Sequence, residues 1–133
     1  MATTSASRLA PAPSVTLGSK KFYAPNSKGF GTVKPTEIFN GGDPSGLVTK
    51  IVWTSWGGAQ ASGHGLNAVN RPNGGYYATL VPIELKPQDR GTCPGSPQLV
   101  YRQLLVREPS RPGGPVGKWF LWSNAHSLCS SAP

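Results

Sequence analysis

The residue best suited to catalysis is His64, which lies between glycines in the segment Ser62-Gly63-His64-Gly65. An imidazole can act as a general base or a metal ligand near neutral pH, and flanking glycines let a substrate approach the backbone. A hydrolase also needs a nucleophile and an orienting acid, and the chain has neither a G-x-S-x-G nor an H-E-x-x-H signature. We therefore keep His64 as a binding-site candidate, with a small secreted hydrolase as an alternative function.

Acidic side chains are too few to favour paired-carboxylate chemistry such as glycoside hydrolysis. The chain has five, and Asp43 lies in a turn, where an aspartate usually caps local backbone groups. The glycines of residues 57–65 do not form a phosphate-binding loop, because the required Gly-Lys-Ser/Thr sequence is missing. We predict no catalytic residue, no metal site and no cofactor.

Four tryptophans form two pairs, Trp53 with Trp56 and Trp119 with Trp122. Exposed rings of this kind can stack on sugars or bases, whereas buried rings fill a core. A spacing of three along a strand predicts that the members of a pair face opposite sides. We expect most of these rings to pack in the core and take Trp56 and Trp122 as the candidates for a binding platform.

Tyr76 and Tyr77 follow a glycine-rich turn, a position at which aromatic side chains often take part in recognition. Packing at the end of a strand is the alternative role. With Trp56, the two tyrosines are candidates for one polar, aromatic groove, for which the neighbouring amides would be Asn67, Asn70 and Asn73.

Strands must position these side chains, because glycine or proline interrupts nearly every stretch long enough for a helix. Short apolar segments between turn residues predict an antiparallel β-sandwich or small barrel. We expect a single β-rich domain over residues 15–133, preceded by a flexible Ala/Ser/Thr/Pro tether over residues 1–14. The expected strands cover residues 15–17, 22–23, 37–39, 47–56, 59–66, 76–85, 98–107 and 118–122.

The segment 47–56 is the clearest strand and is rich in β-branched and aromatic residues. Simple alternation places its odd-numbered residues on the core-facing side: Leu47, Thr49, Ile51, Trp53 and Ser55. Small residues over 59–66 suit a hairpin partner packed beneath the tryptophans. In the segment 76–85, Pro82 points away from the apolar face and indicates an edge or a bulge.

Cys93 and Cys129 are the only cysteines, and their wide separation is unlike a metal-binding spacing. We expect them to form a disulfide, with two buried thiols as the alternative. A disulfide indicates an oxidising compartment, so we expect an extracellular or cell-envelope protein whose signal peptide has been removed. No apolar run is long enough for a transmembrane segment.

The formal net charge of +8 is spread evenly over the chain and lacks the clustered basic run of a nucleic-acid-binding arm. The charge favours attraction to anionic surfaces but indicates no sequence-specific nucleic-acid partner.

Several motifs resemble those of small secreted actinobacterial proteins of uncharacterised function. They are the GGDP-type turn at residues 41–44, the W-x-S-W-G strand at 53–57, the A-x-G-x-G segment at 61–65 and the G-T-C turn at 91–93 ahead of Tyr101. The resemblance covers roughly residues 40–105 and implies an exported β domain. It carries no catalytic residues that transfer to this chain, which departs from the pattern in its arginine-rich stretch over residues 102–111.

These observations predict a secreted, non-enzymatic surface or envelope protein that binds polysaccharide or another anionic polymer. A self-assembling structural subunit is a second alternative, because unpaired strand edges promote self-association.

Overall fold

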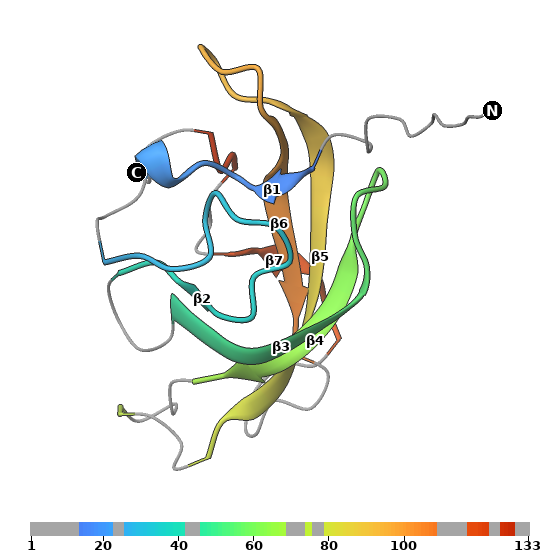
Figure 1. Cartoon of the computed structure of the whole chain (residues 1–133). Coiled ribbons are helices and arrows are strands. Elements are labelled where there is room, and N and C mark those ends of the chain that lie inside the picture. Colours follow the sequence, from blue (N-terminus) through green and yellow to red (C-terminus); the bar gives the residue numbers. More distant parts are fainter. Residues whose placement is uncertain are drawn as a thin grey trace, which may run out of the picture.

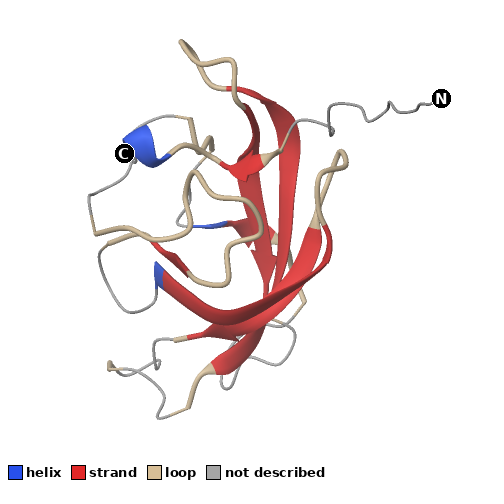
Figure 2. Ribbon diagram, in the orientation of Figure 1, coloured by secondary structure: helices blue, strands red, loops and turns tan. Residues whose placement is uncertain are grey.

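A single, strongly curled sheet forms the protein, as the computed structural model shows (Figures 1 and 2). The structure describes residues 14–22, 26–41, 46–68, 74–75, 79–108, 117–122 and 126–129. Its strands are β1 (Thr16–Leu17), β2 (Ile38–Phe39), β3 (Leu47–Ser55), β4 (Ser62–Asn67), β5 (Val81–Thr92), β6 (Leu99–Arg107) and β7 (Phe120–Leu121). The expected tether over residues 1–14 lies outside the described residues, apart from Ser14.

The strand order is β1-β6-β5-β4-β3-β2, and β7 pairs with β6 beside β1. Every pairing is antiparallel except that of β1 with β6. The predicted all-β fold with one disulfide is confirmed. Its form is a curled half-barrel, so the barrel describes it better than two stacked sheets do (Figure 1).

Two irregularities in β3 invert the expected alternation. The pairing with β4 shifts by one residue between Thr49 and Val52, and Lys50 there has a left-handed φ of 52°. A residue inserted in this way turns the following side chains to the opposite face. Val48 and Ile51 are consequently both buried, so the prediction that only odd-numbered residues face the core is wrong.

The second shift, between Trp53 and Ser55, has the same effect on the tryptophans. Trp53 and Trp56 pack against the same core, with their ring centroids 4.7 Å apart in an edge-to-face arrangement. The prediction that these two rings face opposite sides is therefore wrong, because the intervening backbone is not a regular strand.

The small residues of β4 fit beneath the tryptophans, as predicted. A Cβ atom on Gly63 would lie 2.5 Å from Cε3 of Trp53 and 2.8 Å from the Val52 carbonyl oxygen. Such distances leave no room for a side chain, so this glycine allows the indole ring to lie against the neighbouring strand.

β5 is the longest strand and contains two prolines. Val81, Ile83 and Leu85 are buried, as the alternation predicts, and Pro82 points outward. The pairing with β6 begins only at Glu84, so β5 is locally an edge at Pro82, where no ladder hydrogen bond to β6 is lost.

The core lies inside the curl of the sheet. Segments from both ends of the described chain fill its concave side, and they contribute the buried residues Val15, Leu17, Phe30, Ile38 and Leu128. The expected short strand over residues 22–23 is wrong at Phe22, which ends a 3-10 turn that begins at Lys20. Tyr23 lies outside the described residues.

The edge of β6 is covered in two pieces. β1 pairs with Val100 and Tyr101, and β7 pairs with Leu105 and Val106. Between them, the backbone N–H of Leu128 donates to the Arg102 carbonyl at 2.7 Å. The described segments therefore occupy most of this edge, where another chain cannot pair.

Candidate functional site

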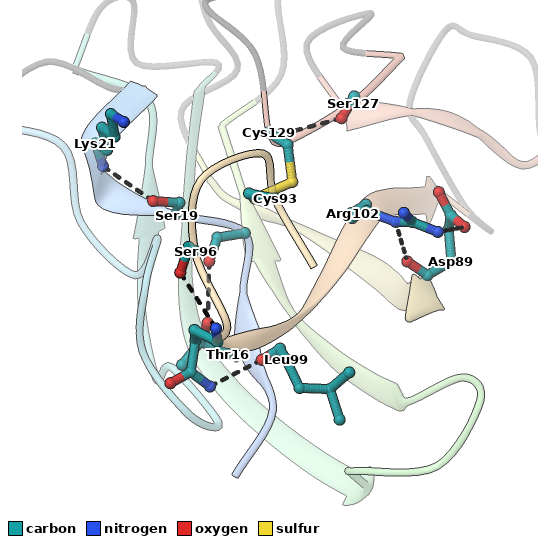
Figure 3. The surroundings of a disulfide bond; sticks show 12 residues. Thr16, Ser19, Lys21, Asp89, Cys93, Ser96, Leu99, Arg102, Ser127 and Cys129 are labelled. Atoms are coloured by element: carbon teal, nitrogen blue, oxygen red, sulfur yellow. Dashed lines mark hydrogen bonds and ion pairs between the residues drawn. A yellow bond between two sulfur atoms is a disulfide. The ribbon is translucent and has the colours of Figure 1, made fainter. Parts of the chain in front are cut away.

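The disulfide joins the loop that follows β5 to the C-terminal segment. Cys93 and Cys129 are both buried, and their Cα atoms are 5.2 Å apart (Figure 3). The Ser127 hydroxyl accepts a hydrogen bond from the backbone N–H of Cys129. The expected disulfide is confirmed, and its burial fits a structural role.

The indole N–H groups of Trp53 and Trp56 are used within the fold. Trp53 donates to the carbonyl oxygen of Pro35, and Trp56 donates to that of Val15, both at 2.8 Å. Trp56 also packs edge-to-face against Tyr101, with ring centroids 5.2 Å apart. The structure therefore places Trp56 among core side chains, in keeping with the core interpretation of the tryptophans.

Trp122 is also a core residue, with only 5% of its surface exposed. Its indole N–H is buried and has no hydrogen-bond partner among the described residues. A ring covered to this extent offers no face on which a sugar can stack.

The other residues of the predicted aromatic groove do not assemble in the described part of the structure. Asn67 is buried and donates its side-chain N–H to the Leu47 carbonyl at 2.7 Å, which is a structural role. Tyr76 and Tyr77, with Asn70 and Asn73, lie outside the described residues.

His64 lies on the exposed, convex face of the sheet. The register aligns it with Val52 on β3 and with Glu84 on β5, and Glu84 is aligned with Arg107 on β6. The Glu84 carboxylate accepts hydrogen bonds from Nε and an Nη of Arg107, at 2.8 and 2.5 Å. His64 has no hydrogen-bond partner among the described residues, so the geometry gives it no orienting acid.

A cationic cluster lies beside this row, formed by Trp119, Lys86 and Arg107. The Lys86 Nζ lies 4.4 Å from the centroid of the Trp119 ring, and the Arg107 Cζ lies 4.7 Å from it. Both distances are within the range of cation–π attraction. The exposed Lys118 precedes Trp119 in the chain and adds a further positive charge.

Sequence reasoning missed this cluster because Trp119 comes from a segment far from both cations. The sequence gives one sign of the cluster: Lys86 alternates with buried residues, so its side chain shares the outer face of β5 with Glu84 and Gln88. The partner strand and its register were needed to bring Arg107 to the same place.

Positive charge on the described residues exceeds negative charge, with ten basic and four acidic side chains. Between described residues, three ion pairs join Glu37 to Lys28, Asp89 to Arg102 and Glu84 to Arg107. These pairs are solvent-accessible and contribute little to stability. The surplus charge is available to attract an anion.

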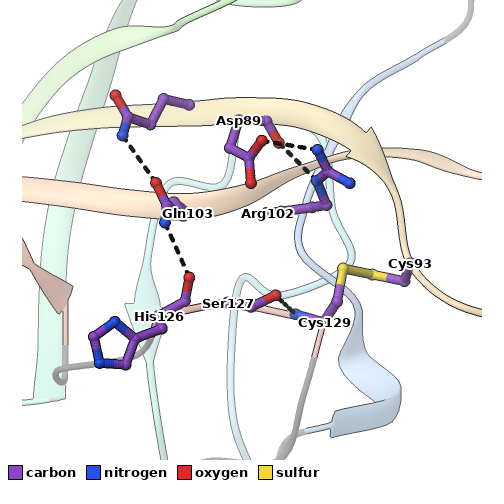
Figure 4. Close-up of polar contacts among 8 residues, drawn as sticks. Asp89, Cys93, Arg102, Gln103, His126, Ser127 and Cys129 are labelled. Atoms are coloured by element: carbon purple, nitrogen blue, oxygen red, sulfur yellow. Dashed lines mark hydrogen bonds and ion pairs between the residues drawn. A yellow bond between two sulfur atoms is a disulfide. The ribbon is translucent and has the colours of Figure 1, made fainter.

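A shallow groove of about 860 Å³ lies further along the same two strands. It is lined by Ala59, Gln60, Gln88, Asp89, Arg90 and Gln103. We call the three glutamines the glutamine track, because their amides form a chain. Gln60 donates to Gln88 at 3.2 Å, and Gln88 donates to Gln103 at 2.9 Å. Gln103 in turn donates to the His126 carbonyl at 3.0 Å (Figure 4).

Tyr101 supports one end of this groove. Its hydroxyl accepts from the N–H of Gly57 and donates to the carbonyl of Gly58, both at 2.8 Å. Arg90 donates to the Gly57 carbonyl at 2.6 Å. Burial raises the pKa of the Tyr101 phenol, although the hydrogen bond from Gly57 and the charge of Arg90 act in the opposite direction.

Known proteins give no match to this chain in family models, among curated proteins or among solved structures. No helix in the described residues has the length and apolar character needed to cross a membrane. The same residues contain no group of three or more His, Cys, Asp or Glu side chains arranged to hold a metal ion.

Proposed function

We propose that this chain is a secreted, non-enzymatic protein of the cell exterior or envelope that binds an anionic polymer. The binding surface is the outer face of β5 and β6, centred on the cationic cluster. The observation that carries the proposal is the placement of Lys86 and Arg107 against the ring of Trp119.

The chemistry of the cluster supports this function in two ways. Arg107 directs two N–H groups to Glu84, whereas Lys86 lies against Trp119 and has no ion-pair partner among the described residues. Its ammonium group can therefore meet an anion without first breaking an ion pair. The half-buried indole ring holds both cations in place by cation–π attraction, so they lose little side-chain entropy when they bind an anion.

Export is supported by the disulfide, since a structural disulfide persists in an oxidising compartment. The resemblance to small secreted actinobacterial proteins supports the same localisation. The hydrolase alternative lacks such support, because His64 is exposed on a strand face without an acid or a nucleophile in hydrogen-bonding contact. The self-assembly alternative gains nothing from β6, whose edge is covered.

The test compares two variants that remove the same charge. Lys86→Gln removes a cation from the cluster, and Lys34→Gln removes an exposed lysine from the loop before β2. Titration with polygalacturonate at 50 mM NaCl should show affinity falling about fivefold for Lys86→Gln and less than twofold for Lys34→Gln. Trp119→Ala should weaken binding at least as much as Lys86→Gln. Equal losses for the two lysine variants would mean that only net charge matters and that the cluster is not the site.

A further inference from the structure

We propose that the polymer is an acidic polysaccharide and that the glutamine track is its sugar-binding subsite. This inference rests on the proposed function and specifies its ligand. It depends on a different observation, the chain of hydrogen-bonded amides formed by Gln60, Gln88 and Gln103.

The hydrogen bonds within the track fix the direction of each amide and leave part of its bonding capacity unused. A side-chain amide has two N–H donors and an oxygen that accepts twice. Gln60, Gln88 and Gln103 each direct one N–H along the chain, and the oxygens of Gln88 and Gln103 each accept one bond. Each amide therefore keeps one donor and at least one acceptor for a ligand.

This arrangement matches the hydroxyl groups of a sugar. Each hydroxyl is both a donor and an acceptor, so it can bond to a free N–H and a free carbonyl oxygen of adjacent amides. Because the amides are already held in place, little side-chain entropy is lost on binding. A polymer without hydroxyl groups would leave these donors and acceptors to water.

The track and the cationic cluster lie on one continuous surface. Gln88 is aligned with Gln103, Lys86 with Leu105, and Glu84 with Arg107, in successive outward rows of β5 and β6. From Glu84 to Gln88 the strand extends about 13 Å, at roughly 3.3 Å per residue. A chain of several sugars can therefore reach the cations of the cluster and the amides at the same time.

Charge along this surface fits a polymer with spaced carboxylates. Asp89 in the groove is paired with Arg102 at 2.8 Å, so its negative charge is offset (Figure 4). Arg90 uses one N–H on the Gly57 carbonyl and keeps others for a ligand. Positive groups thus lie at both ends of the surface, with uncharged amides between them. A uronic-acid polysaccharide supplies hydroxyl groups for these amides, which a polymer carrying only anionic groups lacks.

The experiment compares two carboxylate polymers that differ in their hydroxyl groups, polygalacturonate and polyacrylate of matched charge. Gln88→Leu removes the central amide while keeping a side chain of similar size. It should weaken polygalacturonate binding about tenfold and change polyacrylate binding less than twofold. Gln98→Leu is the matched control, because Gln98 is an exposed glutamine outside the track, and it should leave both affinities within twofold.

Three results would overturn the inference. Equal effects of Gln88→Leu on the two polymers, or no effect on either, would show that the amides serve only as cross-strand contacts, while the cationic cluster could still bind. Failure of the wild-type protein to bind either polymer at 50 mM NaCl would overturn the proposed function as well.

Two further measurements keep the test independent of one variant's folding. Gln103→Leu removes a neighbouring amide and should reproduce the tenfold selective loss. On the wild-type protein, oligogalacturonate should displace labelled polygalacturonate at about one-tenth the concentration of oligoacrylate carrying the same charge. Equal potency of the two competitors would contradict a sugar-specific subsite.

Discussion

Replacing Tyr101 by phenylalanine removes one hydroxyl group and tests how the loop at the end of the groove is held to the sheet. The Tyr101 side chain is fully buried, and its hydroxyl makes one hydrogen bond to each of two adjacent backbone groups in the loop between β3 and β4. Tyr101→Phe removes both bonds and keeps the ring that packs against Trp56. The substitution therefore separates the hydroxyl contribution from the packing contribution.

The expected loss of stability depends on how exposed the two backbone partners of the hydroxyl are, the Gly57 N–H and the Gly58 carbonyl. A neutral hydrogen bond contributes about 1 kcal/mol, and a partner that loses its bond while buried costs more. Gly58 is exposed and Gly57 is half-buried, so water can replace much of what is lost. We expect the free energy of unfolding to fall by about 1–2 kcal/mol, which lowers the melting temperature by roughly 3–8 °C in a chain of this size.

Urea unfolding followed by tryptophan fluorescence measures this loss. Thr54→Val is the matched control, because it removes one exposed hydroxyl that donates to the Ser62 carbonyl and keeps a β-branched side chain. The control should change the free energy of unfolding by less than about 0.5 kcal/mol. A loss for Tyr101→Phe no larger than that of the control would refute the claim that the hydroxyl holds the loop.

Four further outcomes are expected. Because burial raises the pKa of Tyr101 in the folded state, the unfolded chain ionises first, and wild-type stability should decline as the pH rises above about 10. Unfolding at pH 9 and pH 11 should therefore show a smaller stability difference between wild type and Tyr101→Phe at the higher pH. Gly63→Ala should destabilise the protein by about 1–3 kcal/mol in urea unfolding, because the added Cβ would collide with Trp53. Gly58→Ala is its control: the added Cβ meets only ordinary contacts, so the free energy of unfolding should change little. Replacing Cys93 and Cys129 by serine should lower the free energy of unfolding by about 4 kcal/mol, because the disulfide closes a loop with a sequence separation of 36. Calorimetry should then show a melting temperature at least about 8 °C lower. Trp119→Phe should keep more polygalacturonate affinity than Trp119→Ala in equilibrium titration, because a phenyl ring preserves part of the attraction to Lys86 and Arg107.

Local patterns were sufficient to predict most strands and the disulfide. Residues 47–56 and 98–107 carry β-branched and aromatic runs between turn residues, and both form strands close to these limits. The small residues of β4 also indicated their contact with the tryptophans. Such features depend on neighbouring residues, which a single sequence contains.

The side chains of β3 that face the core could not be predicted in the same way. At Lys50 the backbone is left-handed although the position holds neither glycine nor asparagine, and the second shift, between Trp53 and Ser55, falls among residues of ordinary strand propensity. Trp56 was therefore assigned to the wrong face, and a core residue was taken as a possible platform.

The cationic cluster and the glutamine track were not predictable because both depend on register between strands. Gln60, Gln88 and Gln103 come from three different segments, separated by 28 and 15 residues. A shift of one residue in the pairing of β5 with β6 would place Gln88 and Gln103 on opposite faces.

The two-part closure of the β6 edge has a consequence for how the chain folds. Strands β3 to β6 pair with their neighbours in sequence, whereas β1 reaches β6 across more than eighty residues, from Thr16 to Val100. Contacts of such separation carry a large loop-closure cost and tend to form after local hairpins. The hairpin sheet would then exist for a time with the side of β6 unpaired, in the form most prone to join another chain. Oxidation of Cys93 and Cys129 holds the C-terminal segment against β6, so it would shorten this vulnerable period.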